Sequence, residues 1–174
     1  MAIKILPPID LLRNQLDYDS ETGIFVWLVK PYKKTPSGSV AGSTYGQGYR
    51  YIGIDGIRYS AHRLAWKMTT GSDPVNNIDH INGDKSDNKI ANLREATKSQ
   101  NQYNQGKHAD NTSGHKGVCW DKAHGKWKAQ ISINGKNKYI GIFTDINDAA
   151  AAYAAAAERL HGDFLNLGTK SKQQ

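Results

Sequence analysis

Short apolar segments alternate with turn-forming residues along the chain, and this pattern predicts many small strands and helices. The N-terminal part is expected to form a helix, a strand, a hairpin and a second helix, over 9–16, 24–29, 48–60 and 61–70. Asp55-Gly56 stands at the centre of the hairpin, because this dipeptide adopts the tight turn that joins two paired strands. Gly71 is expected to end the second helix.

The segment IDHINGDKSDNKIANLREATKSQNQYN (78–104) predicts a strand, a polar loop, a second strand and a helix. Thr97 and Gln100 form a capping-box pattern, so the helix is expected to begin at Lys98. Asparagine is a poor helix former, yet this helix contains several amide side chains. Something other than helix propensity therefore selects those amides.

The C-terminal part predicts a small sheet followed by one helix. A polar segment over 106–115 has the composition of a linker, and Asn134-Gly135 is a second hairpin signal. The strands and the helix are expected over 117–121, 127–133, 137–143 and 145–161. The middle strand alternates apolar and polar residues, which is typical of a sheet with one buried face.

The charge of the chain favours a polyanionic partner. The 174 residues carry a formal net charge of +7, and six lysines between Lys116 and Lys138 face one acid, Asp121. Aromatic residues are interleaved with these lysines, as on sheets that face nucleic acid. A solvated lysine-rich face is the alternative interpretation of the same pattern.

Cysteine content and hydropathy exclude several classes of protein. The single cysteine, Cys119, excludes an internal disulfide framework and a zinc ribbon built on cysteine pairs, and it fits a reducing compartment. No apolar run approaches the ~20 residues of a membrane span, and the N-terminus lacks the features of a signal peptide. We therefore expect a cytoplasmic protein.

The residues with the most distinctive chemistry are Asp79, His80, Asn92 and Asn101. Hard oxygen ligands beside a histidine are the groups that metal-assisted phosphodiester hydrolysis needs. A histidine is mostly neutral at physiological pH and can then accept a proton from water. For His80 the alternative is a partly buried histidine bonded to backbone, and for Asp79 a turn or capping carboxylate.

With these residues laid out, the pattern HRLAW…IDHINGD…DN…NLR…T…QN…N over 60–104 resembles the HNH, or ββα-metal, nucleases of the phage and intron homing type. The resemblance implies that His80 is the general base and that Asp79 and Asn101 hold the metal ion. It implies that Asn92 orients the site through backbone hydrogen bonds. Mg²⁺ is the expected ion, with Mn²⁺ as a possible substitute.

The C-terminal part, GVCWDKAHGKWKAQISINGKNKYIGIF…AAAAYAAAAERLHGDFLNL, resembles the Apetala-type ethylene-response-factor DNA-binding domain over about 113–167. Where that family has arginine, this chain has Cys119, Asp121 and Ser132. Since arginine paired with guanine is the commonest specific contact, we expect phosphate contacts to outweigh base readout here. The residues expected to bind double-stranded DNA are Lys116, Trp120, Lys122, Lys126, Trp127, Lys128, Gln130, Lys138 and Tyr139, together with Arg94.

Together these patterns predict an α+β protein in which an N-terminal β-hairpin and a ββα-metal module precede a three-stranded antiparallel sheet packed on one helix. The expected divisions are an N-terminal β-rich extension, the nuclease module, a linker, the DNA-binding domain and a tail, over 1–60, 61–105, 106–115, 116–168 and 169–174.

The expected function is that of a metal-dependent DNA endonuclease, monomeric and of the homing or free-standing nicking type. A DNA-binding regulator with an inactive motif and a nonspecific degradative nuclease are the alternatives. RNA is a poorer substrate candidate, because its major groove is too narrow for a sheet that reads DNA. Whether His62 or Arg63 takes part in the site is left open.

Overall fold

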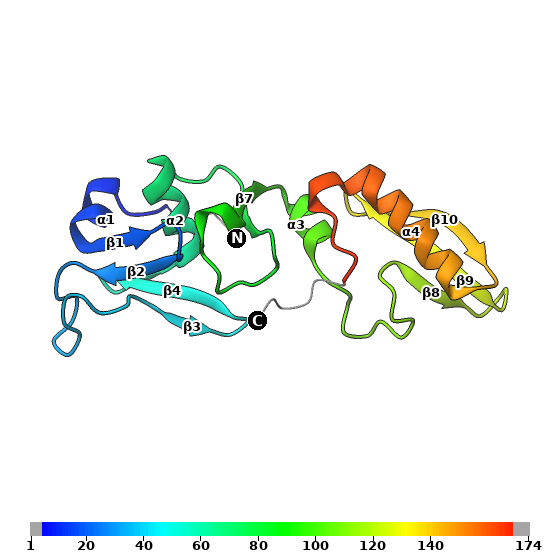
Figure 1. Cartoon of the computed structure of the whole chain (residues 1–174), viewed down its shortest axis with the longest axis horizontal. Helices are drawn as coiled ribbons and strands as arrows, with labels where there is room; N and C mark the ends of the chain where they lie inside the picture. The colour runs from blue at the N-terminus through cyan, green and yellow to red at the C-terminus, as the bar shows by residue number, and fades with distance from the viewer. Residues whose placement is uncertain (1–4, 169–174) are drawn as a thin grey trace. The chain divides into compact units, whose positions relative to one another are not determined.

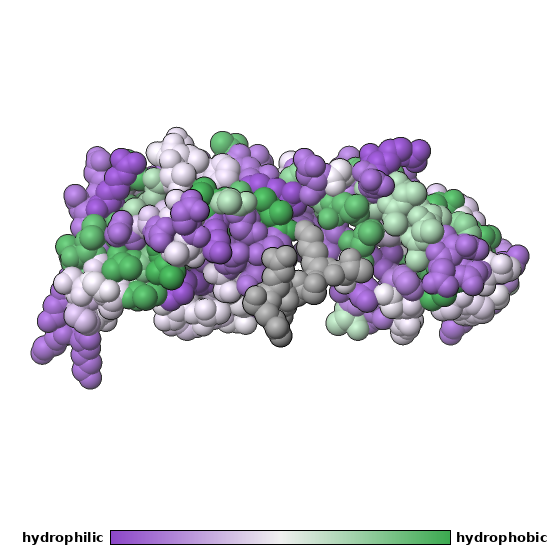
Figure 2. Space-filling model, in the orientation of Figure 1, coloured by the Kyte–Doolittle hydropathy of each residue, from purple (hydrophilic) through white to green (hydrophobic). Residues whose placement is uncertain are grey.

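The computed structural model of the chain describes residues 5–168 and has the expected α+β fold (Figure 1). The chain divides into two compact units, Met1–Glu95 and Ala96–Gln174. Within the described residues, no helix is both long and apolar enough to cross a membrane. On the face shown in Figure 2, hydrophobic and hydrophilic residues are mixed over the surface.

The first unit contains the antiparallel sheets β1–β2 and β3–β4–β5 and the strand pair β6–β7, which ends at the border of the unit. In chain order its elements are α1 (Ile9–Gln15), β1 (Leu16–Asp19), β2 (Ile24–Trp27), β3 (Ser43–Tyr45), β4 (Tyr49–Ile54), β5 (Ile57–Ser60), α2 (Ala61–Thr70), β6 (Asn77–His80), the 3-10 turn η1 (Ile90–Asn92) and β7 (Leu93–Ala96).

The turns of this unit lie where their glycines predict them. Ile54 pairs with Ile57 across the Asp55-Gly56 turn, and both turn residues have positive φ, 50° and 77°, as a tight hairpin requires. Gly71 ends α2 in the left-handed conformation. Strands β1 and β3 were not predicted, because they are short and β3 is exposed throughout, so no alternation of burial marks it.

One hydrophobic core joins the N-terminal extension to the nuclease module. Phe25 on β2, Ile52 on β4 and Leu64 on α2 are all fully buried in this core, together with Ile78 on β6. The expected boundary near residue 60 therefore does not separate two packing units, because the extension supplies nine of the fourteen buried residues of this core.

The second unit has the predicted sheet and helix. Its elements are α3 (Lys98–Asn104), β8 (Val118–Asp121), β9 (Lys126–Ile133), β10 (Lys136–Phe143), α4 (Ile146–His161) and the 3-10 turn η2 (Gly162–Phe164). The strand order is β10-β9-β8, all antiparallel. Ala129 and Ile131 of β9 pack with Ala149 and Tyr153 of α4, so the alanine-rich helix lies close against the apolar face of the sheet, as expected.

Helix α3 belongs to the second unit, although the sequence places it in the nuclease module. The Tyr103 ring stacks on His161 with centroids 3.9 Å apart. The Lys116 ammonium donates to the carbonyl oxygens of Tyr103, Gln105 and Asn166 at 2.6–2.8 Å. These contacts explain why the compact units divide at Glu95 and Ala96 rather than in the expected linker.

The segment 106–115 is held by its own hydrogen bonds, although its composition is that of a linker. The Ser113 hydroxyl donates to the carbonyl oxygens of His115 and Val118, at 2.9 and 2.7 Å. The Asn111 amide donates to His115 O at 3.0 Å, and Lys107 donates to Gly114 O at 2.8 Å. Polar side chains that bond to nearby backbone give such a segment a defined turn structure.

We expect acid to destabilise the second unit through His161. The Nε2 of this buried ring lies 3.1 Å from Ser132 O, and Nδ1 has no hydrogen-bond partner among the described residues. Burial lowers the pKa of His161 below 6.5, and Lys116 also lowers it, whereas the bond to Ser132 raises it. A lowered pKa means that the unfolded chain binds more protons, so stability is present above pH 6.5 and is lost as pH falls through the folded value.

The measurement is thermal unfolding of the wild type and of His161→Gln at pH 7.5 and pH 5.5. The wild type should lose several degrees of melting temperature on acidification, and the variant should lose less. Equal losses in the two proteins would show that His161 does not carry the acid sensitivity.

Candidate functional site

The strand pair β6–β7 carries Asp79 and His80 at the end of β6. Ile78 packs in the core of the first unit, and Asp79 and His80 are both only 4% exposed. The polar loop between the strands therefore begins directly after two buried polar side chains. Such groups must be hydrogen-bonded or ion-paired where they lie.

Asn92 holds this loop closed. Its carbonyl oxygen accepts the Ile81 N–H at 2.8 Å, and its side-chain oxygen accepts the Asn82 N–H at 2.9 Å. Its side-chain nitrogen donates to Asp87 O at 2.8 Å. These are backbone hydrogen bonds of the kind expected of Asn92, and they fix the chain just after His80.

Asn88, which the sequence analysis did not single out, contacts the imidazole of His80. Its Oδ1 lies 3.3 Å from His80 Nε2. The Asn88 side-chain nitrogen donates to Ser86 O at 3.0 Å, and the Asn88 carbonyl accepts the Tyr18 hydroxyl at 2.7 Å. With Oδ1 as the acceptor, we assign the ring proton to Nε2, which makes Nδ1 the basic nitrogen of His80.

The surroundings of His80 favour the neutral ring. Burial lowers the pKa of His80, while the hydrogen bond with Asn88 and the charge of Asp79 oppose this effect. A pKa below 6.5 leaves the imidazole unprotonated at neutral pH. The ring can therefore accept a proton, as a general base must.

Asp79 is paired with Arg94. The Nε and Nη2 atoms of Arg94 lie 3.0 and 2.9 Å from Asp79 Oδ2. The two side chains are 5% and 17% exposed, for Asp79 and Arg94 respectively. Arg94 was predicted to clamp DNA phosphate. The structure instead pairs it with the carboxylate beside His80, because a buried carboxylate needs a charge partner.

His62 lies beside His80. The two rings are 5.1 Å apart in an edge-to-face arrangement, and Tyr49 lies 5.4 Å from His62 and 6.0 Å from His80. Burial lowers the pKa of His62 to about 3, with smaller effects of His80 and Arg63. His62 is therefore an uncharged ring that packs against His80. Arg63 interacts electrostatically with Asp73.

Asn101 lies in the first turns of α3. The Thr97 hydroxyl accepts the Gln100 N–H, and the Gln100 side chain accepts the Thr97 N–H, so the predicted capping box is present. Asn101 is on the second unit and Asp79 on the first, so their shared metal site stays a prediction. Across residues 5–168, no three His, Cys, Asp or Glu side chains gather as a metal centre.

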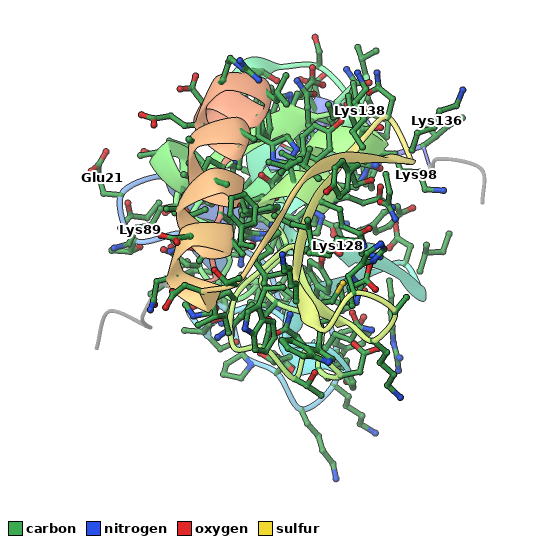
Figure 3. The ribbon with its side chains drawn as sticks, turned by 90° about the vertical axis from the view of Figure 1, so that its right-hand side faces the viewer. Glu21, Lys89, Lys98, Lys128, Lys136 and Lys138 are labelled. Carbon is green, nitrogen blue, oxygen red and sulfur yellow. The ribbon has the colours of Figure 1, made fainter. Side chains whose placement is uncertain are left out.

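The residues that were predicted to bind DNA lie on two faces of the C-terminal sheet. Trp127 packs toward the core with α4, and its cross-strand partner Trp120 meets it edge to face at 5.0 Å. Lys138 pairs with the buried Ile131 on the same face. The strand register places four other predicted residues on the opposite face of the sheet: Lys126, Lys128, Gln130 and Tyr139. Figure 3 labels one of them, Lys128.

Two further lysines of the predicted DNA-binding set differ in their surroundings. Lys122 is exposed in the turn between β8 and β9. Lys116 directs its ammonium to three carbonyl oxygens within the second unit. Because an ammonium has three N–H donors, these bonds leave Lys116 none for phosphate. Lys116 therefore has a structural role here. Trp127 is partly buried against the core, and its contact with DNA stays a prediction.

Comparison with known proteins gives two matches. The HNH endonuclease family model matches residues 59–103. Over 107 residues the chain is 31% identical to Protein 3.8 of Escherichia phage T7, and the alignment covers 61% of this chain and 88% of that protein. The chain belongs to the family of this phage protein. No solved structure matches the chain.

The HNH domain spans both β6–β7 and α3, so it contains Asp79, His80, Asn92 and Asn101. This domain supports a nuclease role and a DNA substrate, and HNH nucleases generally use a divalent metal ion. The family match ends before β8. The resemblance of the C-terminal sheet to the ethylene-response-factor domain therefore stays a prediction.

Proposed function

We propose that this protein is a Mg²⁺-dependent DNA endonuclease of the homing or free-standing nicking type. The observation that carries the proposal is the buried pair Asp79-His80, in which Asn88 orients the imidazole and Arg94 the carboxylate. A neutral, oriented histidine beside a carboxylate within an HNH domain is suited to hydrolysis of a phosphodiester.

In this proposal His80 accepts the proton of the attacking water at Nδ1, while its Nε2–H remains bonded to Asn88. The water oxygen then forms the new bond to phosphorus, the bond to the 3′ oxygen breaks, and the 3′ oxygen takes a proton from solvent water, which leaves a 5′ phosphate and a 3′ hydroxyl. Asp79 and Asn101 would hold the metal ion, because carboxylate and amide oxygens are the hard donors that Mg²⁺ prefers. The ion would stabilise charge on phosphorus and on the departing oxygen.

The second unit would hold the duplex. The sheet face opposite α4 carries Lys126, Lys128, Gln130 and Tyr139, and lysines bind phosphate without selecting a sequence. Cys119 and Asp121 lie on the same face, in register with Lys128 and Lys126. Because a thiol and a carboxylate stand there in place of arginine, we expect this face to read the DNA bases only weakly. One active site per chain cuts one strand, so a monomer would nick.

The test is conversion of supercoiled plasmid to open circles by the wild type with Mg²⁺, with Mn²⁺ and with EDTA. We expect nicking with either ion and none with EDTA, and Asp79→Asn should lose most of the activity. Discrete fragments from phage genomic DNA would support the homing type, whereas a smear would indicate a degradative nuclease. DNA binding without cleavage under all ions would favour the regulator and overturn the proposal.

A further inference from the structure

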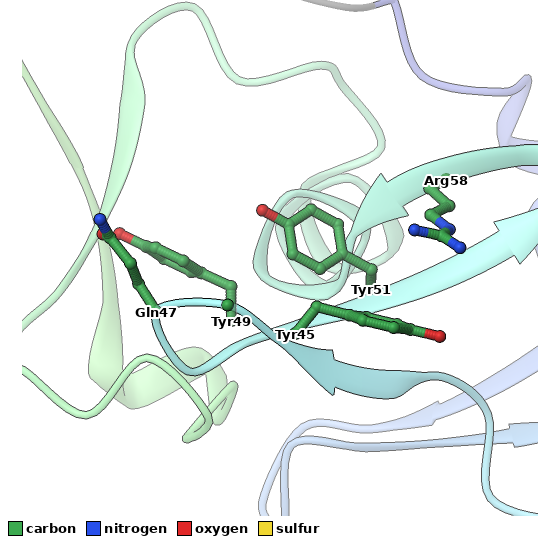
Figure 4. A pocket seen from close by; sticks show the side chains of 6 residues that line it. Tyr45, Gln47, Tyr49, Tyr51 and Arg58 are labelled. Atoms are coloured by element: carbon green, nitrogen blue, oxygen red, sulfur yellow. The ribbon is translucent and has the colours of Figure 1, made fainter.

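One face of the β3–β4–β5 sheet in the first unit carries several tyrosines. Tyr45 on β3, Tyr49 and Tyr51 on β4 and Arg58 on β5 lie on one face of the β3–β4–β5 sheet, which we call the tyrosine face. With Gly46 and Gln47 of the β3–β4 turn, they line an open hollow of about 400 Å³ (Figure 4). Hollows of this size hold small ligands.

The opposite face of this sheet already supplies the core. Ile52, Ile54 and Tyr59 point inward and are 0–9% exposed, whereas Tyr45 is 47% exposed. In an antiparallel sheet with one buried face, the outward positions are ordinarily polar. The Tyr45 ring is therefore not needed for packing of the core, and it leaves flat aromatic surface in contact with water.

Cations accompany the rings at both ends of the hollow. The Arg58 guanidinium lies 4.8 Å from the centre of the Tyr45 ring, and Tyr45 meets Tyr51 edge to face at 6.4 Å. The Lys85 ammonium lies 4.9 Å from the centre of the Tyr49 ring and donates to the Gln47 side chain at 3.3 Å. Figure 4 shows Gln47 and Tyr49 at one end and Arg58 at the other.

One ring of the hollow also contacts the candidate catalytic histidine. The Tyr49 ring that lines it is also the ring 6.0 Å from His80. A DNA strand whose phosphate lies at His80 would therefore have its adjoining nucleotides at Tyr49 and Tyr45. Aromatic rings with interleaved cations are the groups that bind unpaired nucleotides, since bases stack on the rings and phosphates meet the charges.

We infer that the tyrosine face binds unpaired DNA bases next to the scissile phosphate, by stacking on Tyr45 with Arg58 and Lys85 against the neighbouring phosphates. The identity of that phosphate rests on the proposed nuclease function. The substrate class that follows is DNA with unpaired nucleotides beside the cut, such as a bulge, a gap or an opened duplex. A fully paired duplex cannot present a base face to these rings.

The experiment measures binding in the full chain with His80→Ala, so that no cleavage occurs. The probes are a fluorescent thymidine oligomer of about eight nucleotides and a paired duplex, both at one fixed salt concentration. Tyr45→Ala and Tyr45→Leu should weaken binding of the oligomer by about tenfold, because one stacked base is lost. Tyr45→Phe keeps the ring and should bind normally. Duplex binding should change little in all variants.

Ile57→Ala is the matched control, since Ile57 is also exposed on this hairpin but does not line the hollow. It should bind the oligomer like the parent, and melting curves should show all variants folded. Unchanged binding in Tyr45→Ala would overturn the inference, as would an equal loss in Tyr45→Phe. Cleavage is scored separately, with His80 intact and with a duplex that carries a short single-stranded gap. If this gapped duplex stays uncleaved while oligomer affinity depends on Tyr45, the nuclease proposal is refuted and a nucleotide-binding face remains.

Discussion

Replacing His80 by alanine is expected to reduce metal-dependent nicking by about 10³-fold, the usual contribution of a general base, while DNA binding persists. His80 touches Asn88 and lies beside Asp79, but it is not on the sheet face that we propose for DNA binding. The loss should therefore fall on kcat rather than on KM. The measurement is the initial rate of plasmid nicking together with a gel shift of the same protein.

His108→Ala is the control, because His108 is exposed and lies in the segment 106–115 of the second unit. It should nick at the wild-type rate. Added imidazole should restore part of the activity of His80→Ala, since a soluble base can enter the space that the side chain leaves. A variant that nicks as fast as the wild type would show that His80 is not the base.

Gly23→Ala is expected to destabilise the first unit by about 3 kcal/mol, from overpacking and from left-handed backbone strain. Gly23 has φ of 72°, and a Cβ there would lie 2.5 Å from the carbonyl carbon of Asn88 and against the Lys89 nitrogen. Backbone cannot move aside as a flexible side chain can. Because Asn88 orients His80, the surviving folded protein should also nick more slowly.

Gly38→Ala is the control that separates overpacking from backbone strain. Gly38 also has positive φ, 82°, but a Cβ there meets nothing within 4 Å, so it should lose only about 1–2 kcal/mol from backbone strain and keep full activity. Urea unfolding gives the stabilities, and nicking rates at a temperature where both variants are folded give the activities. If the two variants match in both measurements, the turn at Gly23 does not support the catalytic loop.

The local elements of this protein follow from its sequence alone. The Asp55-Gly56 hairpin, the capping box at Thr97 and the end of α2 at Gly71 lie where the residues predict them. Each depends on backbone conformations and hydrogen bonds within a few residues, so local chemistry is sufficient. The same holds for the placement of Asp79 and His80 at the end of a strand and for the alternation of β9.

The tertiary structure decided which side chains meet at the site. Asn88 is held by Tyr18, 70 positions away, and Asp79 by Arg94, while His62 and Tyr49 reach His80 from α2 and β4. Sequence spacing cannot show such contacts, because burial in a shared core selects them. Sequence spacing likewise cannot show which lysines are already bonded within the protein.

In the sequence, a lysine next to a strand predicts a phosphate ligand equally well whether its ammonium contacts water or is bonded to three carbonyl oxygens. At Lys116 it is bonded to three carbonyl oxygens. The charge pattern of the chain therefore predicted a polyanionic partner. Only packing, which decides where each donor is already satisfied, determined which charges remain to bind it.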